Sequence, residues 1–238
     1  MDDTENMTED PAEEELHPVI EEPPRNNLDY YQIKVLGQAN GTIRVDLRGI
    51  FGANPQVQNH SVALWPNSSP IPGTEPAQTY PIKSQSLPFT TILEYDHLSF
   101  FDYGLTYQVN GSTTTICALT VVYNSIEASS VLPVKVRLRL EKTTRTSVEV
   151  DFSLLSGYNP KTYGNWVGIW RDLANVSILP PALGFAEVTT EQSAGTVTIE
   201  GLDLRDGDVY SILYFMNPKD ATAPAAGGAL YFSLPEAS

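Results

Sequence analysis

Few residues of this 238-residue chain have the types and spacing that catalysis or metal binding requires. The three histidines, His17, His60 and His97, are too far apart to form a metal motif, because such motifs place ligands a few residues apart. We expect ordinary surface positions for His60, which precedes a strand, and for His97, which lies in a turn. No pattern typical of a phosphate-binding loop, a zinc protease or a serine hydrolase occurs. The sequence therefore predicts a protein that is not an enzyme and binds no cofactor.

One cluster of carboxylates, Asp203, Asp206 and Asp208, could in principle converge on a calcium ion. Its spacing differs from that of an EF-hand loop, and no later glutamate completes the ligand set. Asp206-Gly207 is also a turn signal. The pattern therefore favours a turn, and we predict no metal site here.

The single cysteine, Cys117, lies in an apolar alternating segment, which is typical of a buried small hydrophobic residue and not of a nucleophile. One cysteine excludes a disulfide within the chain. The N-terminal residues have neither the basic nor the apolar part of an export signal, and no run of roughly 18 apolar residues occurs. We expect a protein without a membrane span in a reducing, cytoplasmic setting.

The net charge of −15 is concentrated at the N-terminus. Residues 1–25 contain ten acidic residues and one arginine, which gives −9 and leaves −6 for residues 26–238. Such a balance does not favour binding to nucleic acid or to anionic membranes. We predict that residues 1–27 form a disordered acidic tail, which either keeps the protein soluble or is offered to a basic surface.

The elements that must position any site are present twice. Residues 43–65 align without a gap with residues 148–170, and seven of the 23 aligned positions are identical. The identities include Trp65 with Trp170 and an Asn-Pro pair in each copy. A fixed period of this kind indicates one fold in two copies. We predict a first domain over 28–126 and a second over 131–238.

Both copies show short segments in which apolar and polar residues alternate, separated by Gly, Pro and Asn. No longer stretch has a helical apolar period with caps. The proline-rich segment 66–88 excludes a central strand and predicts an irregular loop or a frayed edge strand. The fold class predicted is all-β, with two tandem immunoglobulin-like or fibronectin-like antiparallel β-sandwich domains.

Alternation leaves open which side chains of the repeated strand face the core. Trp166 and Trp170 share one face of this strand, and Val167 and Ile169 share the other. Either the β-branched pair is inside, or Trp170 and its counterpart Trp65 are equivalent core residues. We prefer the second arrangement, because a tryptophan at the same position of both copies indicates a shared packing role.

Leu204 and Tyr210 flank a turn with the spacing of a tyrosine corner, in which the phenol hydroxyl bonds to the backbone of the connection. The first copy differs, since Leu98 is followed at the same distance by Gly104. We assign structural roles to Tyr210, Trp65 and Trp170.

The second copy contains a strand at 148–151, an Asn-Pro pair, the segment 165–170 (NWVGIW), and Leu204 before the aromatic strand 210–214. This series resembles the SKICH domain and, more loosely, the fibronectin-like domain that precedes the catalytic part of purple acid phosphatases. Asn165 stands where that motif has an aspartate. The resemblance implies an adaptor module without catalysis, and it implies no particular partner.

Two equivalent loops are the best candidates for a binding site, because they keep Gly and Asn-Pro in both copies but differ in their other side chains. The candidate residues are Gln56 and Gln58 in the first loop and Tyr158, Lys161, Tyr163 and Asn165 in the second. The leading hypothesis is a non-enzymatic module that presents loops and edge strands to a protein partner. One alternative is a carbohydrate-binding protein that uses loop aromatics, and another is a self-assembling structural protein that forms a homo-oligomer.

Overall fold

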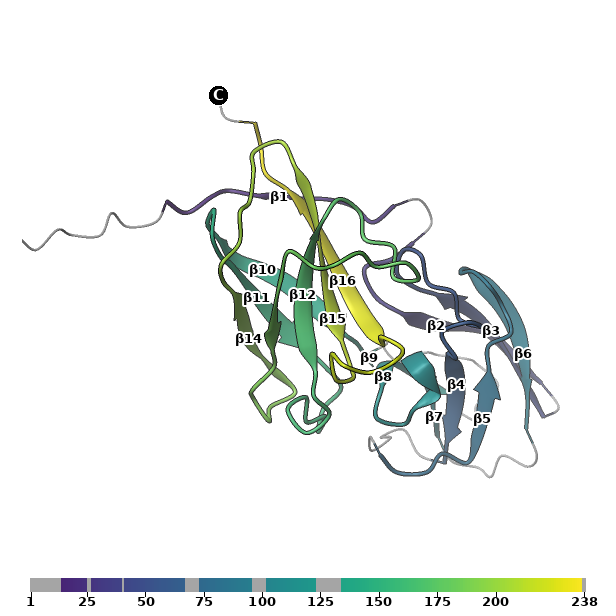
Figure 1. Cartoon of the computed structure of the whole chain (residues 1–238). Helices are drawn as coiled ribbons and strands as arrows, with labels where there is room; N and C mark the ends of the chain where they lie inside the picture. Colours follow the sequence, from purple (N-terminus) through teal and green to yellow (C-terminus); the bar gives the residue numbers. More distant parts are fainter. Residues whose placement is uncertain are drawn as a thin grey trace, which may run out of the picture.

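The computed structural model describes residues 14–24, 27–39, 41–66, 73–95, 102–122 and 134–236, and in this part of the chain nearly all regular structure is β-strand (Figure 1). The strands are β1 (Val19–Ile20), β2 (Gln32–Ala39), β3 (Thr42–Arg48), β4 (Ser61–Trp65), β5 (Gln78–Pro81), β6 (Phe89–Glu94), β7 (Tyr103–Gln108), β8 (Ile116–Val122), β9 (Val134–Lys135), β10 (Arg137–Thr143), β11 (Val148–Ser153), β12 (Trp166–Arg171), β13 (Gly184–Glu187), β14 (Ala194–Ile199), β15 (Val209–Phe215) and β16 (Ala226–Ser233). A single 3₁₀ turn, η1 (Val109–Gly111), is the helical element of the described residues.

The strands form two antiparallel sandwiches that lie side by side (Figure 1). In the first, a sheet of order β2-β3-β6 packs on a sheet of order β5-β4-β7-β8-β9. In the second, β10-β11-β14 packs on β1-β16-β15-β12-β13. This arrangement confirms the predicted fold class of two tandem immunoglobulin-like or fibronectin-like sandwiches.

The two kinds of sheet are buried differently. In the three-stranded sheets, alternate residues point inward, so Val45 of β3 and Val150 of β11 are fully buried while their neighbours are at least partly exposed. In the five-stranded sheets, every residue of β4 and β7 is buried, and so are all residues of β12 except the last. The five-stranded sheets are therefore covered on both faces.

Two short strands are exchanged between the halves. β9, which directly precedes the second sandwich, pairs with β8 of the first, and β1, which precedes the first sandwich, pairs with β16 of the second. The exchange is reciprocal, since Lys135 pairs with Ala118 while Tyr30 at the equivalent position bridges to Gly228. The Lys135 ammonium lies 3.0 Å from the centre of the Tyr30 ring.

The prediction of a disordered tail over residues 1–27 is wrong for residues 14–24. Leu16 donates its backbone N–H to the Thr143 carbonyl at 2.7 Å, and Glu21 donates to the Tyr231 carbonyl at 2.9 Å. The β1 pairing and the Glu21 bond place the segment along β16, and the Leu16 bond places its start at the end of β10. The part of the prediction that concerns residues 1–13 lies outside the described residues.

The two halves also meet through loops. The Tyr158 hydroxyl donates to the Thr114 carbonyl at 2.7 Å, and the Gln58 amide donates to the Val176 carbonyl at 3.1 Å. A Cβ atom on Gly52 would lie 3.0 Å from the Cα of Asn175. Residues of the two loops that were predicted to bind a partner therefore contact the other half of the chain.

Candidate binding cleft at one end of the second sandwich

Trp166 and Trp170 lie on the outer face of their sheet. Val167 pairs with Tyr214, whose ring contacts Phe152 of the facing sheet with a centroid distance of 5.4 Å. Because paired residues of antiparallel strands share a face, Val167 faces the core and the two tryptophans face away from it. The preference for core-facing tryptophans is therefore wrong, and the arrangement with the β-branched pair inside is correct.

Both indoles are nevertheless buried, because other side chains and a loop cover this face. Trp166 stacks on Phe215 with a centroid distance of 4.0 Å, and Trp170 donates its Nε1–H to the Pro180 carbonyl at 2.8 Å. Gly168 between them has no room for a Cβ atom, which would lie 2.6 Å from the Trp170 ring. Trp65 of the first sandwich is buried in the same way and donates to Thr106 at 2.9 Å.

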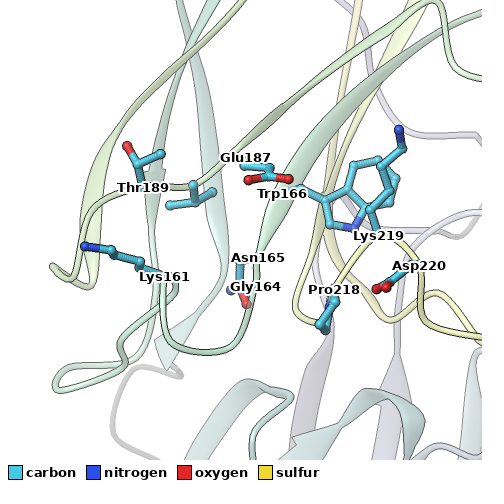
Figure 2. A pocket seen from close by; sticks show the side chains of 10 residues that line it. Lys161, Gly164, Asn165, Trp166, Glu187, Thr189, Pro218, Lys219 and Asp220 are labelled. Carbon is cyan, nitrogen blue, oxygen red and sulfur yellow. The ribbon is translucent and has the colours of Figure 1, made fainter.

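A cleft of about 650 Å³ opens where the outer face of β12 and β13 reaches the end of the sandwich. Its walls come from the loop before β12, the end of β13 with the residues after it, and the loop between β15 and β16. We call it the loop cleft; its lining residues are Lys161, Gly164, Asn165, Trp166, Glu187, Val188, Thr189, Pro218, Lys219 and Asp220 (Figure 2). The first and third of these segments correspond to the B–C and F–G loops of an immunoglobulin-type sandwich, which carry recognition in variable domains.

The acidic and basic side chains of the loop cleft occupy different positions in it. Figure 2 shows the Glu187 carboxylate in the middle of the cleft, with the Lys161 and Lys219 ammonium groups on opposite sides of it. Lys161 lies 3.5 Å from Glu191, and the Lys219 ammonium lies 3.1 Å from the centre of the Phe185 ring. Among the described residues, neither Glu187 nor its neighbour across the cleft, Asp220, has an ion-pair partner.

Trp166 supplies a buried hydrogen-bond donor without a partner. Its side chain is 7% exposed, and within the described part of the chain its Nε1–H reaches no acceptor. Figure 2 places this nitrogen on the edge of the ring that faces the 218–220 turn. A buried donor that makes no hydrogen bond costs about 1–3 kcal/mol, so this group gains stability from any acceptor, a water or a partner oxygen, that reaches it.

Of the four candidate residues predicted in the second loop, two line the cleft. Lys161 is exposed at its wall, and Asn165 is buried at its base, where its side-chain amide donates to the Tyr214 hydroxyl at 3.0 Å. Tyr158 is 1% exposed and belongs to the junction between the halves, and its burial raises its pKa. Tyr163 is half-buried and packs against the Tyr158 ring with a centroid distance of 5.1 Å.

Neither candidate of the first loop, Gln56 or Gln58, lines the loop cleft. Gln56 is exposed, and Gln58 is turned toward the second half by its bond to Val176.

The expectation of a surface position for His60 is wrong, since this residue is 3% exposed and burial lowers its pKa to about 3. His17 is exposed, and His97 lies outside the described residues.

Sequence reasoning missed Glu187, Pro218, Lys219 and Asp220. A signal existed for the turn Pro218-Lys219-Asp220, because Asn217-Pro218 directly follows the apolar strand 209–216 and ends it. No sequence pattern indicated a site at Glu187, because β13 is a four-residue edge strand without clear alternation of polarity.

The aspartate cluster forms a turn with ion pairs: Asp203 with Arg205 at 2.9 Å, Asp206 with Arg145 at 2.9 Å and Asp208 with Arg171 at 3.0 Å. The Arg205 backbone N–H donates to the Tyr210 hydroxyl at 2.7 Å, which is the geometry of a tyrosine corner. Within the described ranges no group of three or more His, Cys, Asp or Glu residues could hold a metal ion. No helix in those ranges has the length and apolar character needed to cross a membrane.

Comparison with known proteins gives structural neighbours only. No family model matches the chain, and no curated protein matches it by sequence. The FN1–FN3 domains of chicken CNTN1 are similar at 9% identity, with a TM-score of 0.27 and coverage of 91% of this chain and 67% of theirs. The central fibronectin-III array of RIM-binding protein is similar at 12% identity, with a TM-score of 0.23 and coverage of 91% and 72%. These values carry no function from those proteins to this chain, and the SKICH resemblance stays a prediction.

Proposed function

We propose that this chain is a non-enzymatic protein-interaction module that holds a segment of a protein partner in the loop cleft. The unpartnered Nε1–H of Trp166 is the observation that carries the proposal. A partner that places a carbonyl oxygen at this donor satisfies it, and the surrounding exposed residues of three segments supply the rest of the contact surface.

The neighbouring edge of β13 supports the same function. β13 pairs with β12, and among the described residues no strand pairs with its other edge. Val188 donates its backbone N–H to the Asn165 carbonyl, so in an antiparallel ladder the backbone groups of Phe185 and Glu187 point away from β12. An extended segment can add to this edge and reach the cleft with its side chains.

The loop aromatics do not favour the carbohydrate alternative. Stacking on a sugar needs an accessible ring face, yet Tyr103, Tyr107 and Tyr158 are at most 5% exposed. Phe185 is 44% exposed, and the Lys219 ammonium occupies the space over its ring.

A peptide library displayed on phage and selected against the full chain tests the proposal. We expect selected peptides to bind the wild-type protein and a Glu200→Trp control, whose substitution lies in an exposed turn outside the cleft. They should lose binding to Glu187→Trp, in which the indole fills the cleft. Peptides that bind Glu187→Trp as tightly as wild type, or a library from which nothing is enriched, would contradict the proposal.

A further inference from the structure

The interior of the loop cleft is acidic, although its lining contains two lysines and two acidic residues. Lys161 and Lys219 are engaged with Glu191 and the Phe185 ring, respectively, and their ammonium groups lie on opposite sides of the Glu187 carboxylate (Figure 2). Glu187 and Asp220 are exposed, and within the described ranges neither side chain has a hydrogen-bond or ion-pair partner. Two free carboxylates on opposite walls attract a cation.

The partner group that fits must satisfy both these carboxylates and the nearby indole donor. We infer that the loop cleft receives a basic side chain, arginine in preference to lysine, from an extended partner segment whose main-chain carbonyl accepts from Trp166 Nε1. This inference rests on the proposed function and specifies the partner. A planar guanidinium has five donors and can bind two carboxylates at once, whereas an ammonium behaves as a point charge.

The net charge of the whole chain also favours a basic partner segment. The net charge of −15 raises the encounter rate with a basic segment and lowers it with an acidic one. The Nε1 atom is buried, so a partner carbonyl reaches it only after the exposed side chains of residues 218–220 move. The Lys219 ammonium contacts the Phe185 ring, and unless it moves with this turn it competes with the incoming cation.

The probe for a test is the capped pentapeptide acetyl-Gly-Gly-Arg-Gly-Gly-amide, titrated into the full ¹⁵N-labelled chain at low salt. Its counterpart carries citrulline, which has the shape of arginine without the charge. We expect the arginine peptide to shift the indole N–H signal of Trp166, and the citrulline peptide to bind ~10-fold more weakly because its hydrogen bonds are not charge-assisted. Raising the salt concentration should weaken only the arginine peptide.

Variants of the charged residues test where the arginine side chain of the peptide binds. The double variant Glu187→Gln, Asp220→Asn should bind the arginine peptide ~10-fold more weakly, since both charge-assisted contacts are lost. Glu200→Gln is the control, because this exposed carboxylate lies outside the cleft and pairs with none of its lining residues, and it should bind as wild type does. Lys219→Gln should bind more tightly, since a competing positive charge is removed.

The results separate this inference from the function on which it rests. Equal binding of the two peptides, no shift of the Trp166 signal, or unchanged binding to the double variant would overturn the arginine site. If library peptides still lose binding to Glu187→Trp, the cleft remains a protein-binding site for a different side chain. If they do not, the proposed function fails as well.

Discussion

The Nδ1 atom of His60 lies 3.0 Å from the hydroxyl oxygen of Tyr107 in the core of the first sandwich, where both side chains are at most 3% exposed. The second sandwich has a matching pair, in which Asn165 donates to the Tyr214 hydroxyl at 3.0 Å. The two pairs are equivalent, since Tyr107 and Tyr214 pair with corresponding valines of β4 and β12. In each half the buried tyrosine hydroxyl has a polar partner at the same repeat position, which is His60 in the first half and Asn165 in the second.

This relationship predicts a pH dependence. Burial lowers the pKa of His60 to about 3, whereas an unfolded histidine titrates near 6.5. Below pH 6.5 the unfolded chain binds a proton that the folded chain does not accept, so the free energy of unfolding falls with pH until it levels off near pH 3. The loss between pH 7 and pH 5 should be about 2 kcal/mol. His60→Asn, which copies the second half, should remove this part of the slope in urea unfolding measured at both pH values. Parallel slopes for variant and wild type would show that His60 is charged or exposed in the folded state.

The junction between the halves should depend on Gly52. Gly52 and its repeat counterpart Gly157 have φ angles of 77° and 80°, so an alanine costs about 1–2 kcal/mol at either position. A Cβ atom at Gly52 would also collide with Asn175, whereas one at Gly157 meets nothing within 4 Å. We therefore expect Gly52→Ala, but not Gly157→Ala, to open the junction.

Cys117 reports this opening, because its Cβ lies 3.3 Å from a Cβ built on Gly227 of the second half and its side chain is 2% exposed. Burial also raises the pKa of its thiol. Labelling by a thiol reagent in native buffer should be ~10-fold faster in Gly52→Ala than in Gly157→Ala, which corresponds to about 1.4 kcal/mol. Equal rates in the two variants would show that the Gly52 contact does not hold the halves together.

Trp170 should be important for stability although it faces away from the core between the sheets. It is 3% exposed and bonded to the Pro180 carbonyl. We expect Trp170→Ala to reduce the free energy of unfolding by about 3–5 kcal/mol through the cavity it leaves. Trp170→Phe should cost less, since most of the packing remains. A denaturation midpoint of Trp170→Ala equal to that of wild type would mean that the loop carrying Pro180 does not cover this ring.

The segment 14–24 should be held on the second sandwich by its backbone bonds. Glu21→Pro removes the donor to the Tyr231 carbonyl, and the substitution also removes the carboxylate that accepts from Ser233 at 2.6 Å. We expect a loss of about 1–3 kcal/mol and faster proteolytic cleavage within residues 14–24. Glu22→Pro is the control, because this exposed neighbour lies outside the paired residues of β1. Equal cleavage of the two variants would show that the Glu21 bonds do not retain the segment.

The repeat and the alternation of polarity were enough to predict the all-β class and the two sandwiches. Val45 and Val150 alternate with neighbours that are at least partly exposed, because one face of each three-stranded sheet is exposed to solvent. Alternation of polarity identifies the core-facing residues only in sheets of this kind. The prolines of segment 66–88 predicted no central strand, since proline cannot donate to a ladder, and the described residues of this segment form one edge strand, β5.

The tertiary structure alone decided what covers the five-stranded sheets. Every residue of β4 and all but the last of β12 are buried, so polarity gives no information on which way Trp166 and Trp170 point. The strand exchange by β1 and β9, the burial of His60 and Tyr158, and the placing of Glu187 and Asp220 in one cleft each depend on packing between segments far apart in sequence. Sequence periodicity is a local property, and it reports the pattern within one strand; contacts across a junction arise only when the folded surfaces meet, and no local pattern encodes them.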